Sequence, residues 1–353
     1  MAERAAPVPR PPSRRAVVKG LLGLTLTLAG IGCTPVRSSP PATPTLRPPT
    51  SSPSNLVTLH TPVFTYHGHR GTVDAVAWHG RRIASGSDDG TVQVWDAATG
   101  GHTLTYRGHS SKVSAVAWSP DGRRIASGSN DATVQVWNAA TGGHLLTYQG
   151  HALAVSDVTW SPDGKRIVSA SLDGTVQVWD ATTGHHLLTY HTTIDSPILQ
   201  VGWSPDGKLI ISAGENGTVI VWDATSGTDV FVYRGHTAAV ITARWSPDGA
   251  RIASGGLDTT VQVWDATTGK HVLIYHGHAG SRFVTDVSWS PHGDRLASGG
   301  ADETVQVWKA TTGEHILTYD GHTATVLQLA WSPDATRIAS GSVDTTVQIC
   351  QAG

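Results

Sequence analysis

From residue 56 onward the chain writes one unit of about 42 residues seven times, and this repeat limits the possible folds more than any other feature. A Trp closes six of the copies, and the closing positions are Trp95, Trp137, Trp179, Trp222, Trp264 and Trp308, with Cys350 in the seventh slot. The successive gaps are 42, 42, 43, 42, 44 and 42 residues. Such a regular period indicates repeated units that bury a core only by packing against their neighbours.

Each copy has the pattern of four short strands. In residues 113–148 the runs VSAVAW, RIASGS, TVQVW and HLLTY are separated by the turn sequences SPDG, ND and NAATGG. β-Branched and aromatic residues favour strands, whereas Gly, Asn, Asp and Pro favour turns. All 13 Trp and all seven Tyr occupy fixed slots, which indicates packing rather than separate binding sites. The sequence therefore predicts an all-β domain over residues 56–353.

Two dipeptides make this unit similar to a known family. GH stands near the start of six copies, as in Gly108-His109, and WD, WN or WK near the end of six, as in Trp95-Asp96. The unit resembles the WD-repeat β-propeller, and the resemblance implies seven four-stranded antiparallel blades around a central channel. The seventh copy has only three strands, while residues 62–69 (PVFTYHGH) match the fourth-strand pattern HLLTYQGH. We therefore expect the N-terminal strand to join the last blade and close the ring.

Most copies also carry a His, a Ser and an Asp at fixed spacing from the closing Trp. The resemblance implies a buried hydrogen-bonded chain from Trp to Ser to His to Asp. The sets are His69, Ser85, Asp89 and Trp95; His109, Ser127, Asp131 and Trp137; His151, Ser169, Asp173 and Trp179; His236, Ser254, Asp258 and Trp264; His278, Ser298, Asp302 and Trp308; and, without an indole, His322, Ser340 and Asp344. The fourth copy departs from the pattern with Ile194 and Asn216 but keeps Ser212 and Trp222, so we expect blades four and seven to be looser, by drift or as a specialised binding edge.

Repetition also argues against a hydrolase. A Ser–His–Asp triad performs nucleophilic catalysis once per enzyme, and no Gly-rich nucleophile elbow accompanies these serines. The chain has 18 His, but no Cys or clustered carboxylates stand beside them. We predict no catalytic residue, no cofactor and no metal site.

The resemblance implies that partners dock on one rim, the top rim, made of the turns between second and third strands and the loops that lead to the next inner strand. The turn slot before each buried Asp, or before Asn216 in blade four, holds Asp88, Asn130, Leu172, Glu215, Leu257, Ala301 and Val343. The candidate partner-binding residues are Lys112, Leu153, Leu172, Asp195, Glu215, Leu257, Phe283 and Val343. Exposed, their aliphatic and aromatic members would form an apolar patch typical of a partner site, although single exposed apolar residues are also normal.

The first 55 residues have the pattern of an export address. Residues 1–32 contain Arg14 and Arg15, which resemble a twin-arginine signal, followed by an apolar run too short to span a membrane. The run ends at GIGC, which resembles a lipobox and makes Cys33 the expected lipid attachment site, although Gly30 replaces the usual bulky aliphatic residue. A cleaved soluble signal or an uncleaved amphipathic start are the alternatives. Residues 33–55, rich in Pro, Ser and Thr, are expected to form a disordered tether.

The net charge of the repeats limits the classes of partner that they can bind. Residues 1–55 hold seven of the 25 basic residues and one of the 27 acidic ones, so the repeats carry 18 basic and 26 acidic residues. A net-negative domain argues against nucleic acid as a partner. We predict an exported bacterial lipoprotein, anchored to the cell membrane, whose monomeric propeller is a non-catalytic scaffold for protein partners. The alternatives are a ligand-binding receptor or propeller enzyme that uses the central channel, and an envelope or adhesion module that acts through edge strands.

Overall fold

The computed structural model describes residues 57–191, 196–278, 280 and 282–353. The export signal, Cys33, the tether, Ile194 and Asp195 lie outside the described residues. The described part lies in one compact unit, Pro53–Gly353, and all of its assigned elements are strands. In this part of the chain, no helix has the length and apolarity needed to cross a membrane.

The strands fall into seven blades. Blade one comprises β3 (Val73–His79), β4 (Arg82–Ser87), β5 (Val92–Asp96) and β6 (His102–Tyr106). Blade two comprises β7 (Val113–Trp118), β8 (Arg124–Ser129), β9 (Val134–Asn138) and β10 (His144–Tyr148). Blade three comprises β11 (Val155–Trp160), β12 (Arg166–Ser171), β13 (Thr175–Asp180) and β14 (His186–His191). Blade four comprises β15 (Ile198–Trp203), β16 (Leu209–Gly214), β17 (Val219–Asp223) and β18 (Asp229–Tyr233).

Three blades complete the ring. Blade five comprises β19 (Val240–Trp245), β20 (Arg251–Gly256), β21 (Val261–Asp265) and β22 (His271–Tyr275). Blade six comprises β23 (Val284–Trp289), β24 (Arg295–Gly300), β25 (Val305–Lys309) and β26 (His315–Tyr319). Blade seven comprises β27 (Val326–Trp331), β28 (Arg337–Ser342), β29 (Val347–Gln351) and the N-terminal β2 (Phe64–Tyr66), and β1 (Val57–Leu59) precedes them all.

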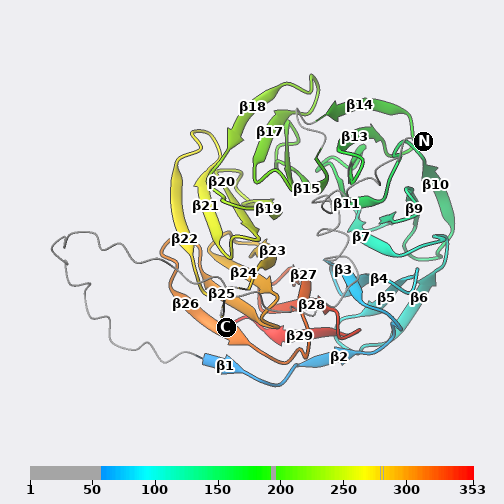
Figure 1. Cartoon of the computed structure of the whole chain (residues 1–353). Helices are drawn as coiled ribbons and strands as arrows, with labels where there is room; N and C mark the ends of the chain where they lie inside the picture. The colour runs from blue at the N-terminus through cyan, green and yellow to red at the C-terminus, as the bar shows by residue number, and fades with distance from the viewer. Residues whose placement is uncertain (1–56, 192–195, 279, 281) are drawn as a thin grey trace, which may run out of the picture. The chain divides into compact units, whose positions relative to one another are not determined.

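Within each blade, neighbouring strands pair antiparallel in the order of the sheet, from an inner strand to an outer one (Figure 1). The second and third strands are buried along almost their whole length, because neighbouring blades cover both faces of each sheet. The hydrophobic clusters accordingly combine two blades, as where Val134 of β9 joins Val155 and Trp160 of β11. The prediction of seven four-stranded antiparallel blades is confirmed.

The ring closes through the N-terminal strand, as predicted. Phe64, Thr65 and Tyr66 of β2 pair antiparallel with Ile349, Gln348 and Val347 of β29. Tyr66 then stacks on Trp95 of blade one, with ring centroids 4.5 Å apart. The first described residues thus join the last blade to the first.

The strand β1 was not predicted. Val57, Thr58 and Leu59 pair in parallel with Leu317, Thr318 and Tyr319 of β26, which makes blade six five-stranded. Figure 1 shows β1 outside β26, on the circumference of the ring. Three residues with alternating character are too short a pattern to stand out in a sequence, so only the tertiary structure identifies this strand.

Candidate partner-binding surface

The top rim is built by one backbone contact that recurs in every blade. The residue in the turn slot between the second and third strands donates its backbone N–H to a carbonyl of the loop before the inner strand. The bonds are Asp88 N to Thr72 O (2.9 Å), Asn130 N to Lys112 O (2.9 Å), Leu172 N to Ala154 O (3.0 Å), Glu215 N to Pro197 O (3.2 Å), Leu257 N to Ala239 O (2.9 Å), Ala301 N to Phe283 O (3.0 Å) and Val343 N to Thr325 O (3.0 Å). Each blade therefore contributes two segments to the rim, the turn and the loop. The described candidate residues lie on these segments.

Buried histidines hold this rim in place. In blade one His69 lies between Ser85 Oγ, 2.8 Å from its Nε2, and Asp89 Oδ2, 2.9 Å from its Nδ1. Trp95 donates from Nε1 to the same Ser85 hydroxyl at 3.4 Å. Asp89 also accepts from the backbone N–H groups of Arg70 and Thr91, so one carboxylate joins the loop to the turn.

The same arrangement recurs around the ring. The His–Asp distances are 2.9 Å for His109–Asp131, 3.2 Å for His151–Asp173, 2.8 Å for His236–Asp258, 3.0 Å for His278–Asp302 and 2.7 Å for His322–Asp344. The His–Ser distances are 2.9 Å to Ser127, 2.8 Å to Ser169, 2.8 Å to Ser254, 2.8 Å to Ser298 and 2.7 Å to Ser340. The closing Trp donates to Ser at 3.3 Å in the blades that contain Trp137, Trp179 and Trp264.

Three blades depart from the complete set. In blade four Trp222 still donates to Ser212 at 3.3 Å, and Asn216 caps Thr218 in place of the missing carboxylate. In blade six the Nε1 of Trp308 has no hydrogen-bond partner among the described residues, so the indole link to Ser298 that the resemblance implied is absent there. In blade seven Cys350 is fully buried, and burial raises the pKa of its thiol to about 12, so it fills space rather than acting as a nucleophile.

Burial makes these sets unsuitable for catalysis. Ser85 and Ser127 have no exposed surface, and His69 and His109 are buried. Burial also lowers the pKa of His109, although the hydrogen bond and the charge of Asp131 oppose this shift. The lowered pKa favours the neutral ring. A nucleophile must reach a substrate, and these hydroxyls face only their own blade. The sets are structural hydrogen-bond networks that satisfy polar groups in the sheet interior.

Lys112 occupies the most charged part of the rim. Its Nζ lies 2.7 Å from Asp74 Oδ1 and 2.7 Å from Asp88 Oδ1, and its side chain is only 10% exposed. Burial alone would lower the pKa of Lys112, but the two carboxylates outweigh burial and raise it. Burial raises the pKa of Asp74 to about 7, against the attraction of Lys112. This ion-paired lysine therefore fastens blade one to blade two instead of projecting toward solvent.

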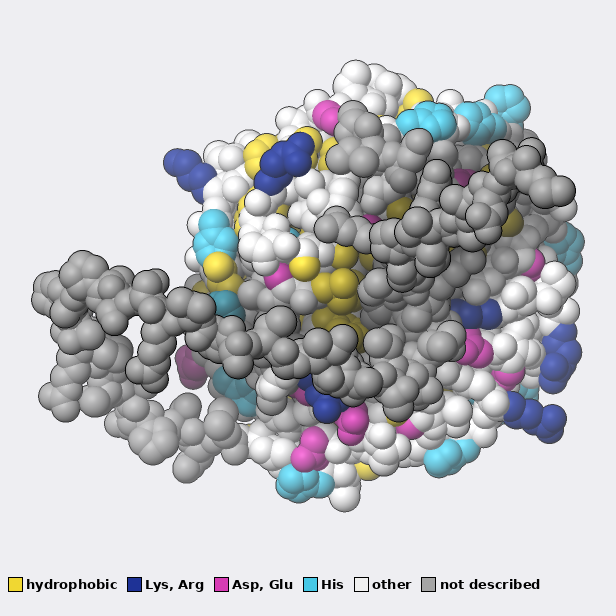
Figure 2. Space-filling view, viewed as in Figure 1, with side chains coloured by type: hydrophobic (Ala, Val, Ile, Leu, Met, Phe, Trp, Pro, Cys, Tyr) yellow, Lys and Arg dark blue, Asp and Glu magenta, His cyan; other side chains and the backbone are white. Residues whose placement is uncertain are grey.

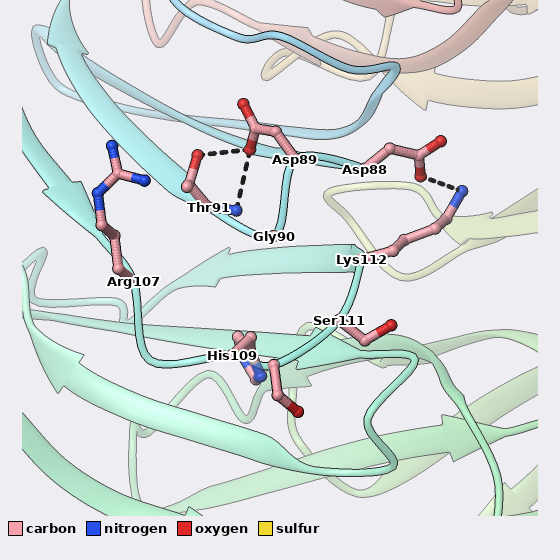
Figure 3. Close-up of a pocket in the computed structure, with 9 residues that line it drawn as sticks. Asp88, Asp89, Gly90, Thr91, Arg107, His109, Ser111 and Lys112 are labelled. Carbon is pink, nitrogen blue, oxygen red and sulfur yellow. Dashed lines mark hydrogen bonds and ion pairs between the residues drawn. The ribbon is translucent and has the colours of Figure 1, made fainter.

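A pocket of about 410 Å³ opens beside this cluster (Figure 3). It lies between the turn that carries Asp88 and Asp89 and the loop that carries His109 and Lys112, with the exposed Arg107 on its outer side. The pocket is lined by backbone and charged groups rather than by apolar side chains. It can offer carboxylates and a guanidinium to a polar segment of a partner.

The apolar candidates differ in exposure. Leu153 is 53% exposed and Val343 is 42% exposed, whereas Leu172, Leu257 and Phe283 are half-buried. Among the turn residues Ala301 is buried and Glu215 is half-buried. Leu153 and Val343 are thus the apolar rim residues most available to a partner, while Leu172, Leu257 and Phe283 expose only part of their side chains. Within the described residues, no three His, Cys, Asp or Glu side chains gather closely enough to hold a metal ion.

The repeats match a known family over most of the chain. A family model described as "WD domain, G-beta repeat" matches residues 60–96, 100–138, 142–180, 184–223, 227–265, 269–309 and 313–350. The chain belongs to the WD-repeat family. WD-repeat propellers are typically scaffolds for protein–protein interaction, and the family is generally not enzymatic.

One curated protein gives a short local match. Over 50 residues the chain is 48% identical to Gem-associated protein 5 of Homo sapiens. This stretch is 13% of the chain and 3% of that protein, so the chain spans a very small part of this relative. The match adds a similarity in the repeat itself, not in the whole molecule.

A polar lining inside this WD-repeat propeller was missed by the sequence analysis. The third residue of each inner strand points toward the neighbouring inner strand, and in blades one and two it is Ala75 or Ala115. In the other blades a polar side chain accepts a backbone N–H of the next blade: Asp157 from Val201 (3.1 Å), Gln200 from Ala243 (3.1 Å), Thr242 from Val287 (3.4 Å), Asp286 from Leu329 (2.9 Å) and Gln328 from Val76 (2.7 Å). These five bonds form a belt that runs from blade three through blade seven to blade one.

The belt surrounds a charged centre. Arg244 of blade five lies 3.8 Å from Asp157 of blade three and 3.7 Å from Asp286 of blade six, measured from guanidinium nitrogen to carboxylate oxygen. Burial raises the pKa of both carboxyls, against the attraction of Arg244. The guanidinium faces a cavity of about 440 Å³ lined by inner strands of six blades. The available signal was this third slot of the inner strands, which holds Ala, Asp, Gln or Thr, together with the single arginine, Arg244, at the position two residues after it.

Proposed function

We propose that this propeller is a non-catalytic scaffold that binds partner proteins on its top rim. The observation that carries the proposal is the contrast between a nearly constant frame and a variable rim. Each turn residue is fixed by the same backbone bond, yet its side chain is acidic, amide or aliphatic from blade to blade. A rigid backbone that presents different side chains at equivalent positions offers recognition without further ordering cost.

A cross-linking pull-down from native membranes tests the rim. The variant Leu153→Glu/Val343→Glu places two charges on the most exposed apolar rim residues. Its matched control, Leu145→Glu/Val230→Glu, places the same charges on outer strands at residues that are 54% and 59% exposed. We expect the rim variant to lose a partner that the wild type and the control recover. Equal recovery by all three proteins would refute the site.

The proposal includes a location. Arg14, Arg15, the short apolar run and Cys33 support export and lipid attachment at the outer side of the cell membrane, with residues 33–55 as a tether. Labelling cells with an alkyne palmitate analogue should mark the wild type and not Cys33→Ala, and Cys33→Ala should leave the membrane fraction. A labelled Cys33→Ala protein would contradict lipid attachment at this residue.

The central cavity supports a second candidate function, the binding of a small polar ligand in the channel. Its titratable groups are not shared by all blades: Arg244 is the one arginine at its slot of the seven inner strands, and at the slot of Asp157 only Asp157 and Asp286 are titratable. A thermal-shift screen of small polar compounds against the wild type and Arg244→Ala tests this candidate. Compounds that stabilise the wild type alone would support it, and equal shifts would count against it.

A further inference from the structure

The outer edge of blade six holds a fifth strand, and blade five presents a similar edge without one. On blade six, β1 covers β26, and Tyr319 is fully buried where the equivalent Tyr275 of β22 retains 8% exposure. Ile316 is half-buried beneath β1, whereas Val272 at the same slot of β22 is 47% exposed. An extended segment on the outer edge of a blade therefore buries apolar surface in this protein. Among the described residues, no strand pairs with the outer edge of β22.

Charge explains why β1 belongs on blade six. After β1, His60 Nδ1 lies 2.8 Å from Asp320 Oδ1, and Leu59 O accepts the backbone N–H of Asp320 at 3.2 Å. The residue after each outer-strand Tyr is Arg107, Gln149, His191, Arg234, His276, Asp320 or His67. Only blade six has an acidic residue at this slot, so a strand followed by His finds its electrostatic partner there.

Blade five differs from the other edges in its exposed side chains. β22 exposes two aliphatic residues at alternate positions, Val272 (47%) and Ile274 (42%). In four other blades a Thr occupies the slot of Ile274 and pairs with the outer-strand His three residues earlier. These pairs are Thr105–His102 (3.1 Å), Thr147–His144 (3.2 Å), Thr189–His186 (2.7 Å) and Thr318–His315 (2.9 Å).

Several other outer strands expose one aliphatic residue at the slot of Val272, such as Leu145, Leu187 and Val230, but β22 exposes a second one, Ile274, where most others have Thr. Figure 2 shows histidine side chains at intervals around the ring, where the outer strands of five blades begin with His. Ile274 cannot form the hydrogen bond that the threonines make, so its part of the edge stays apolar. An exposed apolar edge strand with free pairing groups is the usual target of strand addition.

We propose that β22 binds an extended segment of a partner protein by parallel strand addition. In the register that β1 takes on β26, the segment places aliphatic residues opposite Leu273 and Tyr275 and lies along the exposed Val272 and Ile274. An Asp or Glu directly follows its aliphatic residues. Its carboxylate meets the exposed His276, reversing the His60–Asp320 pair of blade six. This site on the circumference is separate from the top rim and goes beyond the scaffold function proposed above.

A labelled peptide tests the proposal on the full-length protein. The probe is LVTLETP, residues 56–62 of this chain with Glu in place of His60, and its binding is measured by fluorescence anisotropy at pH 6, where imidazolium is a stronger carboxylate partner. We expect saturable binding and slowed hydrogen exchange at residues 271–275. Ile274→Lys should abolish both effects, while the matched control Leu145→Lys, on the outer edge of blade two, should bind as the wild type does.

A charge exchange tests the specificity. His276→Asp should weaken LVTLETP about three- to fivefold and should bind the unchanged sequence LVTLHTP better than LVTLETP, as expected for one exposed ion pair. The rim variant Leu153→Glu/Val343→Glu should still bind the peptide, so failure of the top-rim proposal would not affect this result. Binding unaffected by Ile274→Lys, or protection at β26 instead of β22, would overturn the proposal. Self-association of the protein alone that Ile274→Lys removes would also overturn it, because a second copy would then be the occupant.

Discussion

At the scale of single residues, one carboxylate in a blade accepts hydrogen bonds from several groups of the rim. Asp131 accepts from the ring of His109, from the backbone of Ser110 and from the backbone and hydroxyl of Thr133. One side chain thus fixes the loop before the inner strand and the turn after the second strand.

Asp131→Ala should destabilise the protein by about 1–3 kcal/mol, since it leaves a buried imidazole nitrogen without its partner. Denaturant unfolding followed by Trp fluorescence measures the change. Asn216→Ala in blade four is the matched control, because Asn216 bonds Thr218 and faces no histidine at this slot. A loss as large in the control would show that turn capping, and not the histidine, accounts for the effect.

The carboxylates of the histidine sets make the free energy of unfolding depend on pH. Burial raises the pKa of Asp258, but the hydrogen bond and charge of His236 outweigh it and lower the pKa from 3.8 to about 2. The unfolded chain therefore binds more protons than the folded one between about pH 4 and pH 2, so stability is present above this window and is lost as pH falls through it. The pKa of Asp89 and of Asp173 is lowered in the same sense.

Measured from pH 5 to pH 2, the free energy of unfolding should fall, and Asp258→Asn should reduce the slope while lowering stability at pH 5. Chemical denaturation at each pH gives both quantities. An unchanged slope in Asp258→Asn would contradict the assignment of this carboxylate to the transition.

At the scale of elements, six of the seven blades contact the next blade through an arginine at the start of the second strand. Arg124 of β8 lies 4.5 Å above the ring of Trp160 of β11. It also donates to the carbonyls of Gly164 (3.1 Å) and Ala181 (3.1 Å) in the turns of blade three. The cation–π contact recurs for the arginines of six blades, and blade four has Leu209 in place of the arginine.

Arg124→Leu should cost about 1–3 kcal/mol, because it removes a cation–π contact and two hydrogen bonds to backbone carbonyls. Thermal unfolding should show the lowered midpoint. Lys208→Leu provides the comparison, since Lys208 sits directly before the same slot of blade four with a side chain 78% exposed. We expect that variant to unfold within a degree or two of the wild type; similar losses in both would show that charge in general, rather than the interblade contact, is responsible.

At the scale of the whole molecule, blade four lacks several of the side-chain contacts that the other blades share. Blade four has Asn216 for the buried Asp, Ile220 for the Gln that binds Tyr elsewhere, and Leu209 for the arginine. In addition, within the described residues the indole nitrogens of Trp203 and Trp245 have no hydrogen-bond partner. A closed ring opens where its interblade contacts are fewest.

Native-state hydrogen exchange should therefore show the fastest opening in β16 and β17 among the second and third strands of all blades. Blade two, with a complete histidine set and Arg124, is the internal reference. Uniform protection around the ring would mean that ring closure makes the sheets open as one unit.

The sequence by itself determined the number of blades, their four strands and the closing role of residues 62–69. The number of copies and their four strands follow from the roughly 42-residue period and its turn signals, and the resemblance to WD-repeat propellers identifies the copies as blades and residues 62–69 as the closing strand. The same resemblance implied that the repeated His, Ser and Asp are buried hydrogen-bonded sets. The export signal and Cys33 remain predictions from sequence.

The tertiary structure alone decided what happens between blades and at the edges. β1, the pair His60–Asp320 and the centre formed by Arg244 with Asp157 and Asp286 join residues that are 42 to 260 positions apart. The repeat period does not predict such contacts, because they depend on which residues differ between blades. The exposure of the rim was also undecided by the sequence: Leu172 and Val343 occupy the same turn slot, yet Leu172 is half-buried and Val343 is exposed. The repeat therefore determines the contacts that all blades share. The contacts of residues that differ between blades depend on the folded ring.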